Sequence, residues 1–385
     1  MNRDHVDAMN AQSEIAIPRF SSAGSNKPDL PDEALVVESE FERDLAKFAS
    51  RLALYKNVGA SDAMFESALH DTGLRLVKIV DKQQIGTNFP IVGAIVSGML
   101  SIDYFLPRRR PGVPQKPVLS KTISEGSSFY VSRDTEAVFT VTPNTWLVMR
   151  DRVYAGVETQ IEIEVSIKLG AGLSSLSDAD LIGRIGEIDF TNVSDLVTAA
   201  HPVLAEIAAR RELLRELVST VRTDPKLRDD AELLPEFYKY VLHRAPSDAR
   251  LRLHLIRPDA PVHPHAHRWA MVSYVLSGQI TPKYHSLEGD ALPATNDAGA
   301  VNISHRLEAG SCYAFGDPLI HSFRGAPGSA TLTLRGPAEK QAAAEFRADG
   351  FMQKFSVEAS AEPSLTMTPE QFEYGVGHLK MINVL

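Results

Sequence analysis

The stretch His263–Gly278 reads His-Pro-His-Ala-His-Arg-Trp-Ala-Met-Val-Ser-Tyr-Val-Leu-Ser-Gly, and the rest of the chain can be interpreted around it. Histidines at 263, 265 and 267 alternate just before an apolar run. Residues two apart on a β-strand point to the same face, so these side chains can all project to one side. Two imidazoles on one face can bind one metal ion, and His321 in a later β-rich run offers a third ligand.

These residues resemble the two motifs of the cupin superfamily, in which a first hairpin carries H-x-H, an acidic residue and a closing Gly, and a second hairpin carries one more His. The resemblance implies the ligands His265, His267 and His321, with Gly278 as the closing Gly. The acidic position falls on Met271, so the usual glutamate is missing. What remains resembles the three-histidine cupins, which include the thiol dioxygenases and small bacterial cupins of unsettled function.

The register of the histidine cluster leaves one alternative, with His263 and His265 as the ligating pair. From His267, Met271 is four residues on and Gly278 eleven, as the cupin pattern requires. The earlier pair would need two more residues than that pattern has. We therefore expect that His265 and His267 bind the metal and that His263 does not.

The chain also departs from the thiol dioxygenases, which it resembles from about residue 238 to 337. Their supporting Ser-x-His-x-Tyr strand is replaced by Thr331, Thr333 and Arg335, and their carboxylate-gripping arginine aligns near Lys239. A thiol substrate is therefore not expected. Arg335 is a candidate to clamp a substrate carboxylate from the barrel interior, although an arginine, Arg150, also stands at the matching place in the first half.

Composition limits the function classes. The chain has 385 residues, enough for two domains, and 44% hydrophobic residues, as in a globular protein. A net charge of −9 argues against nucleic-acid binding, because phosphate contacts need a basic surface. The single cysteine, Cys312, allows no intrachain disulfide, and no apolar run reaches membrane-spanning length. We expect a cytoplasmic protein with a small-molecule substrate and no membrane partner.

The two halves of the sequence overlay one another as a repeat of roughly 150 residues. The overlay pairs 94–98 with 274–278, 125–134 with 308–317, and 146–150 with 331–335. It places Ile85 and Thr87 opposite His265 and His267, and Val138 opposite His321, so the first half has no ligand set. That half is expected to be structural or regulatory, and the alternative is that it keeps a metal-free ligand pocket.

The overlay predicts a mainly β fold with helical lead-ins, built from two cupin-like (double-stranded β-helix, jelly-roll) domains. We expect a mobile tail at 1–31, a degenerate cupin-like domain at 32–175, a metal-binding cupin domain at 176–345 and a C-terminal extension with a helix at 346–385. Other helices are expected at 32–55, 61–70 and 229–243, and at 191–221 either one long helix or two broken near His201-Pro202, with His201 as a turn residue. A helix starting at Thr368 is expected to pack on a barrel or on a second subunit, as in a homodimer.

Further candidates surround the expected metal. Trp269 shares the ligand face and can wall the pocket or be an ordinary core aromatic, and Lys239 and Tyr313 are candidate substrate contacts, although Tyr313 has a counterpart in Tyr130. His285 and His305 occur only in the second half and are candidates for acid–base work, or are exposed strand histidines.

A neutral three-imidazole set leaves coordination positions open, which favours Fe(2+), although Zn, Mn, Ni or Cu would satisfy the same ligands. The expected function is a mononuclear non-heme iron oxygenase, dioxygenase-like, acting on a small polar metabolite that carries a carboxylate. The alternatives are a non-catalytic metal-binding bicupin that acts as a sensor or structural protein, and a metal-dependent isomerase or lyase.

Overall fold

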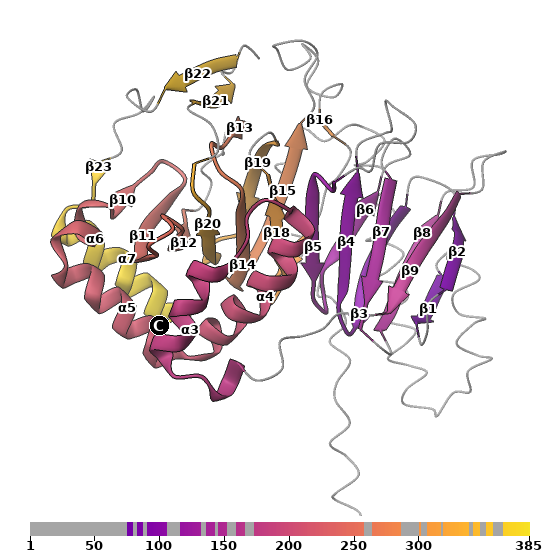
Figure 1. The fold of residues 1–385 in the computed structure, drawn as a ribbon, viewed down its shortest axis with the longest axis horizontal. Coiled ribbons are helices and arrows are strands. Elements are labelled where there is room, and N and C mark those ends of the chain that lie inside the picture. The colour runs from indigo at the N-terminus through magenta and orange to yellow at the C-terminus, as the bar shows by residue number, and fades with distance from the viewer. Residues whose placement is uncertain are drawn as a thin grey trace, which may run out of the picture.

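The computed structural model describes residues 75–79, 83–87, 91–105, 116–131, 136–142, 145–151, 159–165, 173–257, 264–285, 300–301, 306–316, 319–338, 342–346, 352–356 and 365–385. The expected tail, the helices expected at 32–55 and 61–70, and both His263 and His305 lie outside these residues. Within them the fold is mainly β and forms two jelly-roll halves side by side (Figure 1). The expected fold class is therefore confirmed, while the exact domain boundaries stay a prediction.

The first half consists of two facing groups of strands. One sheet has the order β1-β8-β3-β6, and the strands of the other are ordered β2-β9-β7-β4-β5. Their bounds are β1 (Arg75–Ile79), β2 (Gln83–Thr87), β3 (Ile91–Ser97), β4 (Leu100–Phe105), β5 (Leu119–Ile123), β6 (Ser128–Val131), β7 (Glu136–Val141), β8 (Thr145–Asp151) and β9 (Thr159–Val165).

The second half repeats this plan. Strand β5 pairs with β18, and through this pair one sheet of the first half continues into the second half as β18-β14-β20-β12-β11-β10-β23. The opposing sheet has the order β16-β15-β19-β13-β21-β22, and β17 pairs with β15. The bounds are β10 (Glu232–Leu233), β11 (Phe237–Arg244), β12 (Arg250–Ile256), β13 (His265–Ala266), β14 (Met271–Ser277), β15 (Gln279–His285), β16 (Ala300–Val301), β17 (Leu307–Glu308), β18 (Cys312–Phe315), β19 (Ile320–Gly325), β20 (Ala330–Arg335), β21 (Ala342–Phe346), β22 (Met352–Ser356) and β23 (Leu365–Thr366).

The two halves share strand order and turn geometry. The order β1-β8-β3-β6 corresponds to β12-β20-β14-β18. Strands β3 and β14 each carry a register shift just before the Ser-Gly turn that follows them. Both turn glycines, Gly98 and Gly278, have positive φ, at 87° and 70°, which L side chains rarely adopt. The Ser-Gly pairs that the sequence overlay aligned thus occupy equivalent turns.

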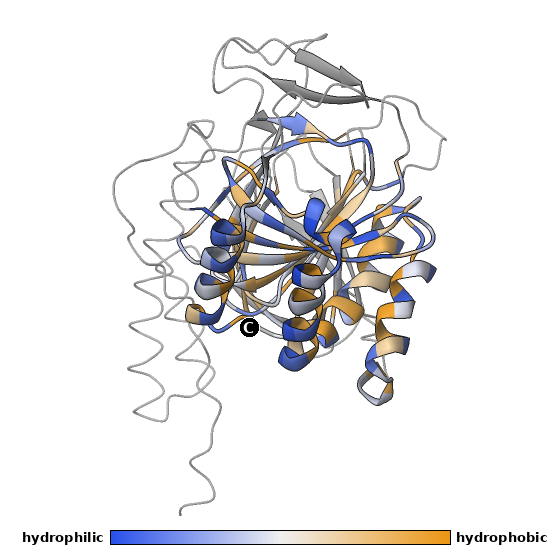
Figure 2. Ribbon diagram, turned by 90° about the vertical axis from the view of Figure 1, so that its left-hand side faces the viewer, coloured by the Kyte–Doolittle hydropathy of each residue, from blue (hydrophilic) through white to orange (hydrophobic). Residues whose placement is uncertain are grey.

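Helices cover one face of the second half. The helical segments are η3 (Leu173–Ser175), α3 (Asp178–Gly183), η4 (Arg184–Glu187), α4 (Val193–Ala209), α5 (Arg211–Thr223), α6 (Pro225–Asp229) and α7 (Pro369–Met381). Figure 2 shows their hydrophobic sides turned toward the sheet and their hydrophilic sides outward. They enclose a core with outward-facing sheet residues such as Leu251, Leu253, Leu332 and Leu334. No helix among the described residues has both the length and the apolar character needed to cross a membrane.

The expected start of the last helix is confirmed. Thr368 accepts a hydrogen bond from the Gln371 backbone, and the Gln371 side chain accepts one from the Thr368 backbone, which forms a capping box. The helix packs on the outer face of β11, where Phe372 meets Tyr240 edge-on at 5.1 Å between ring centroids. The helix therefore packs on the barrel of its own chain, which is one of the two arrangements expected for it.

The prediction of a helix at 229–243 is wrong. Helix α6 ends at Asp229, and the chain continues as the strands β10 and β11. In β11 the positions of Phe237, Lys239 and Val241 face one side and Tyr238 and Tyr240 the other. Aromatic and β-branched residues favour strands. Because both sides of this strand are covered, its sequence lacks the polar alternation that would have marked the period of two.

Neither alternative for 191–221, one long helix or a break near His201-Pro202, matches the structure. Helix α4 continues through Pro202, and the chain breaks at Arg210. His201, expected in a turn, is buried within α4 with its ring 5.7 Å from that of Tyr274. The Arg210 guanidinium donates to the carbonyls of Leu173 and Leu176, which fixes the corner between α4 and α5.

Candidate metal centre

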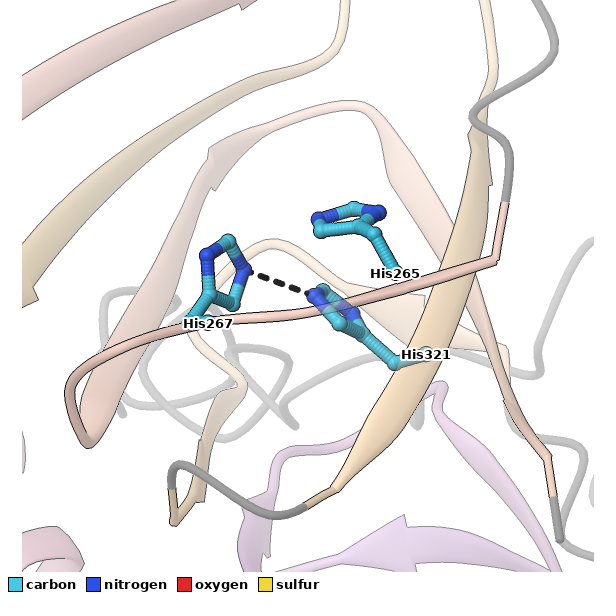
Figure 3. A group of neighbouring side chains, drawn as sticks. All are labelled: His265, His267 and His321. Carbon is cyan, nitrogen blue, oxygen red and sulfur yellow. Dashed lines mark hydrogen bonds between the residues drawn. The ribbon is translucent and has the colours of Figure 1, made fainter. Parts of the chain in front are cut away.

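Three histidines meet inside the second jelly roll (Figure 3). His265 on β13 lies directly across from His321 on β19, so both side chains share one face of the sheet. His267 follows two residues after His265, and its Nε2 lies 2.9 Å from His321 Nε2. His321 is 2% exposed, and the other two rings are half-buried. The expected ligand set is therefore brought together.

The geometry of these rings fits a metal ion. One nitrogen from each histidine can be chosen so that all three lie within 4.8 Å of one another. Two nitrogens bound at about 2.1 Å to one ion, at a right angle, would lie about 3 Å apart. The His267–His321 separation of 2.9 Å matches that arrangement. His265, His267 and His321 could thus hold one divalent ion as neutral imidazole ligands.

Apolar and aromatic residues enclose the histidines. Phe315 stacks against His267 at 5.8 Å and lies 4.2 Å from the His321 ring. Met271, at the position where cupins carry an acidic residue, is 7% exposed and pairs with Phe315 across β14 and β18. No carboxylate among the described residues joins the three-histidine group. The group therefore adds no negative charge to a bound ion.

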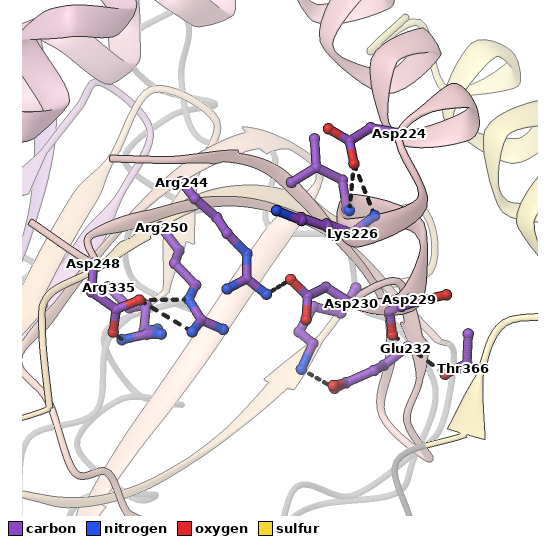
Figure 4. A network of polar contacts seen from close by, with 12 residues as sticks. Asp224, Lys226, Asp229, Asp230, Glu232, Arg244, Asp248, Arg250, Arg335 and Thr366 are labelled. Carbon is purple, nitrogen blue, oxygen red and sulfur yellow. Dashed lines mark hydrogen bonds and ion pairs between the residues drawn. The ribbon is translucent and has the colours of Figure 1, made fainter. Parts of the chain in front are cut away.

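The predicted substrate contacts lie on the same inner face. Trp269 stacks on His267 at 5.7 Å. The Arg335 guanidinium lies 4.8 Å from the Trp269 ring centroid, and the residue is 4% exposed. Its Nη1 donates to Asp248 (Figure 4) and to the Gly336 carbonyl. Arg335 is thus held beside Trp269 by the end of its own strand.

Lys239 and Tyr313 occupy different parts of this face. Lys239 forms an ion pair with Glu232, and burial lowers the pKa of the amine to about 8. Tyr313 is 4% exposed on β18, and burial raises the pKa of its phenol to about 12. Its hydroxyl bonds Ser273. Tyr313 is therefore part of an internal hydroxyl network.

The side chain of His285 and the whole of His305, the expected acid–base histidines, lie outside what the structure describes. The backbone of His285 lies across from Ile320, one position from His321. His305, like His263, is outside the described residues. Their roles remain predictions.

The structure adds Arg252 and His254, which sequence reasoning did not select. Both lie on β12 and face inward with Thr331 and Thr333. His254 Nδ1 lies 3.4 Å from Thr333 Oγ1, and Thr333 also bonds Ser273 at 2.8 Å. Burial lowers the pKa of His254 well below its ordinary value. The alternation Arg-Leu-Arg-Leu-His-Leu at 250–255 was the available signal, since the leucines face the helices.

Comparison with known proteins gives structural likeness alone. No family model matches the chain, and no curated protein does. KdgF from Halomonas sp. is 18% identical with a TM-score of 0.22, over 28% of this chain and 84% of that one. The coconut allergen cocosin is 12% identical with a TM-score of 0.23, over 71% and 78%. A RmlC-like cupin from Shewanella frigidimarina is 16% identical with a TM-score of 0.22, over 28% and 83%.

At these identities and TM-scores the likeness says nothing of function. The chain's own jelly-roll halves and its three-histidine group support the cupin superfamily, as the sequence resemblance implied. They also support a metal-binding site, whose metal they do not name.

Proposed function

We propose that this chain is a mononuclear non-heme iron oxygenase of the cupin type, acting on a small polar metabolite that carries a carboxylate. The observation that carries the proposal is the neutral three-imidazole group, with Met271 where a fourth, anionic ligand would stand. When bound, divalent iron would supply open coordination positions and redox chemistry.

The residues around the group can bind, orient and shield a substrate. His265, His267 and His321 would hold the ion. Phe315 and Met271 make the adjoining wall apolar and exclude water from it. The Trp269 ring contacts both His267 and the guanidinium of Arg335. An acidic group bound by Arg335 would therefore lie beside the metal centre. Burial lowers the pKa of His254, so its imidazole is neutral near pH 7 and could donate a hydrogen bond from Nε2 to a substrate oxygen.

Metal reconstitution tests the proposal. The full chain would be stripped with a chelator, reloaded with Fe(2+), Zn, Mn, Ni or Cu, and assayed for oxygen uptake with a panel of small carboxylates. We expect oxygen uptake only with Fe(2+), and its loss in the His321→Ala variant. Turnover without oxygen would instead favour an isomerase or lyase. Metal and ligand binding without any turnover would favour a sensor.

A further inference from the structure

The inner face of the second jelly roll carries more positive than negative charge. Five cations on β11, β12 and β20 interact there with three carboxylates from neighbouring segments. Ion pairs join Lys239 to Glu232, Arg244 to Asp230, and both Arg250 and Arg335 to Asp248 (Figure 4). Arg252 is the fifth cation. Among the described residues of this cluster, two positive charges are thus left without a matching carboxylate.

Arg252 is the least compensated of these cations. The described part of the chain gives its side chain no ion pair or hydrogen bond, and its Nε is buried without a partner. Burial, followed by repulsion from Arg335 and Arg250, lowers the pKa of the guanidinium to about 9. A buried charge without a counter-ion destabilises the free protein, and an incoming anion relieves that cost.

Several buried donors surround this guanidinium. Trp269 lies with its ring centroid 5.5 Å from Arg252 and 4.8 Å from Arg335. Trp269 Nε1, Arg335 Nε and His254 Nε2 are all buried, and none of them finds a hydrogen-bond partner within the described residues. Arg335 and His254 are only 4% and 8% exposed. Buried donors are nearly always bonded in folded proteins, so their grouping around one guanidinium indicates a missing acceptor.

The cluster lies between the protein surface and the metal centre. Arg244 at the end of β11 is 38% exposed, and Asp248 in the following turn is 53% exposed. Further inward, His254 stacks on Phe237 at 4.5 Å, Phe237 lies 6.3 Å from Phe323, and Phe323 lies 6.5 Å from His321. Trp269 contacts His267 directly. An anion held at Arg252 would therefore lie beside Trp269, which itself contacts the ligand His267.

We propose that Arg252, with Lys239, Arg335 and Trp269, forms a binding site for a doubly negative small molecule, and that this is the charge of the substrate. The two charges belong either to two carboxylates of one molecule or to one phosphate ester, since guanidinium groups bind both. The inference deepens the proposed function and rests on it for turnover, but anion binding itself needs no metal.

Tryptophan fluorescence offers a direct test. The chain has two tryptophans, so a Trp146→Phe background leaves Trp269 as the reporter. Succinate, inorganic phosphate and acetate would each be titrated at constant ionic strength into the full chain, with bound metal and after chelation. We expect saturable binding of succinate or phosphate in both forms, at least tenfold tighter than that of acetate. The tighter of the two dianions identifies the source of the charge.

Variants separate this site from a structural role. Arg252→Met should weaken dianion binding about 30-fold or more, as expected for losing a buried charged partner. It should leave metal content unchanged, and it should leave the ligand-free unfolding midpoint unchanged or higher because an uncompensated charge is removed. Arg252→Lys should restore part of the affinity. Arg215→Gln, on the exposed side of α5, should bind like the parent.

Three results would overturn the inference: acetate binding as tight as that of succinate and phosphate, unchanged affinity in Arg252→Met, or no saturable binding of any probe. The proposed function fails separately, through absence of metal or of oxygen uptake. Because chelated protein is included, loss of the metal cannot be mistaken for loss of the anion site.

Discussion

At the scale of single residues, the metal site can be tested by comparing its three ligands with His263, a histidine close to them in the sequence. Each of His265→Ala, His267→Ala and His321→Ala removes one of the three converging imidazoles and should reduce bound metal from about one ion per chain to a small fraction. His263→Ala should retain it, because the cupin spacing starts from His265. Elemental analysis after gel filtration measures this. Full retention by His267→Ala would refute the register.

Lys239 should make stability depend on pH. The pKa of its amine is about 8 in the folded chain against an ordinary 10.5, mainly through burial and then repulsion from Arg252, with Glu232 opposing. As pH rises, the folded state therefore loses this proton at a lower pH than the unfolded state does. Below pH 8 the buried charge destabilises the folded state by about 3 kcal/mol, and this cost disappears between about pH 8 and 10.5. Stability rises through that window.

The Lys239→Met variant isolates this effect from other groups that titrate there, such as Cys312, whose pKa burial raises. The unfolding free energy of the parent minus that of the variant should increase from pH 7 to pH 10, by up to about 3 kcal/mol. Urea denaturation at each pH gives both values. A difference that stays flat would show that Lys239 titrates normally.

Two residues of the site were not foreseen because alternation along their strand does not say which side faces the interior. Arg252 and His254 point inward only because the leucines between them pack against helices, and a sequence does not show which face a helix will cover. By contrast, the histidine ligands were predictable, since their spacing alone places them on one face. Arg335 was predicted inward by the same alternation, but its pairing with Asp248 depends on a turn at the far end of β12.

At the scale of elements, the turn after β14 depends on Gly278. A Cβ there would lie 2.8 Å from the Ser329 Cα, and the backbone has a positive φ of 70°. Gly278→Ala should therefore lower the free energy of unfolding by about 1–3 kcal/mol. Gly377→Ala in α7 is the control, since a Cβ there meets nothing within 4 Å. It should raise stability by about 0.5–1 kcal/mol. Equal effects in chemical denaturation would contradict this account.

At the scale of the whole molecule, the repeat was predictable and the junction between the halves was not. Matching Ser-Gly turns and apolar strands appear in the sequence of each half. The junction depends on β5 pairing with β18, two strands far apart in the chain, whose register no local pattern specifies. Here Ser311 Oγ lies 2.8 Å from Ser127 Oγ and 3.1 Å from Ser124 Oγ, so hydroxyls of both halves form one cluster around the buried Ser311.

Because one sheet runs through this junction, we expect both halves to unfold together. Trp146 reports on the first half and Trp269 on the second. The fluorescence of a Trp269→Phe chain therefore follows the first half alone, and that of a Trp146→Phe chain follows the second. Ser311→Ala, introduced into both, removes the hydrogen bonds that Ser311 makes with Ser124 and Ser127, and it should lower the unfolding free energy by about 1–3 kcal/mol in each. Ser219→Ala on exposed α5 should change it by less than about 0.5 kcal/mol. A decrease seen by only one tryptophan would mean that the halves unfold independently.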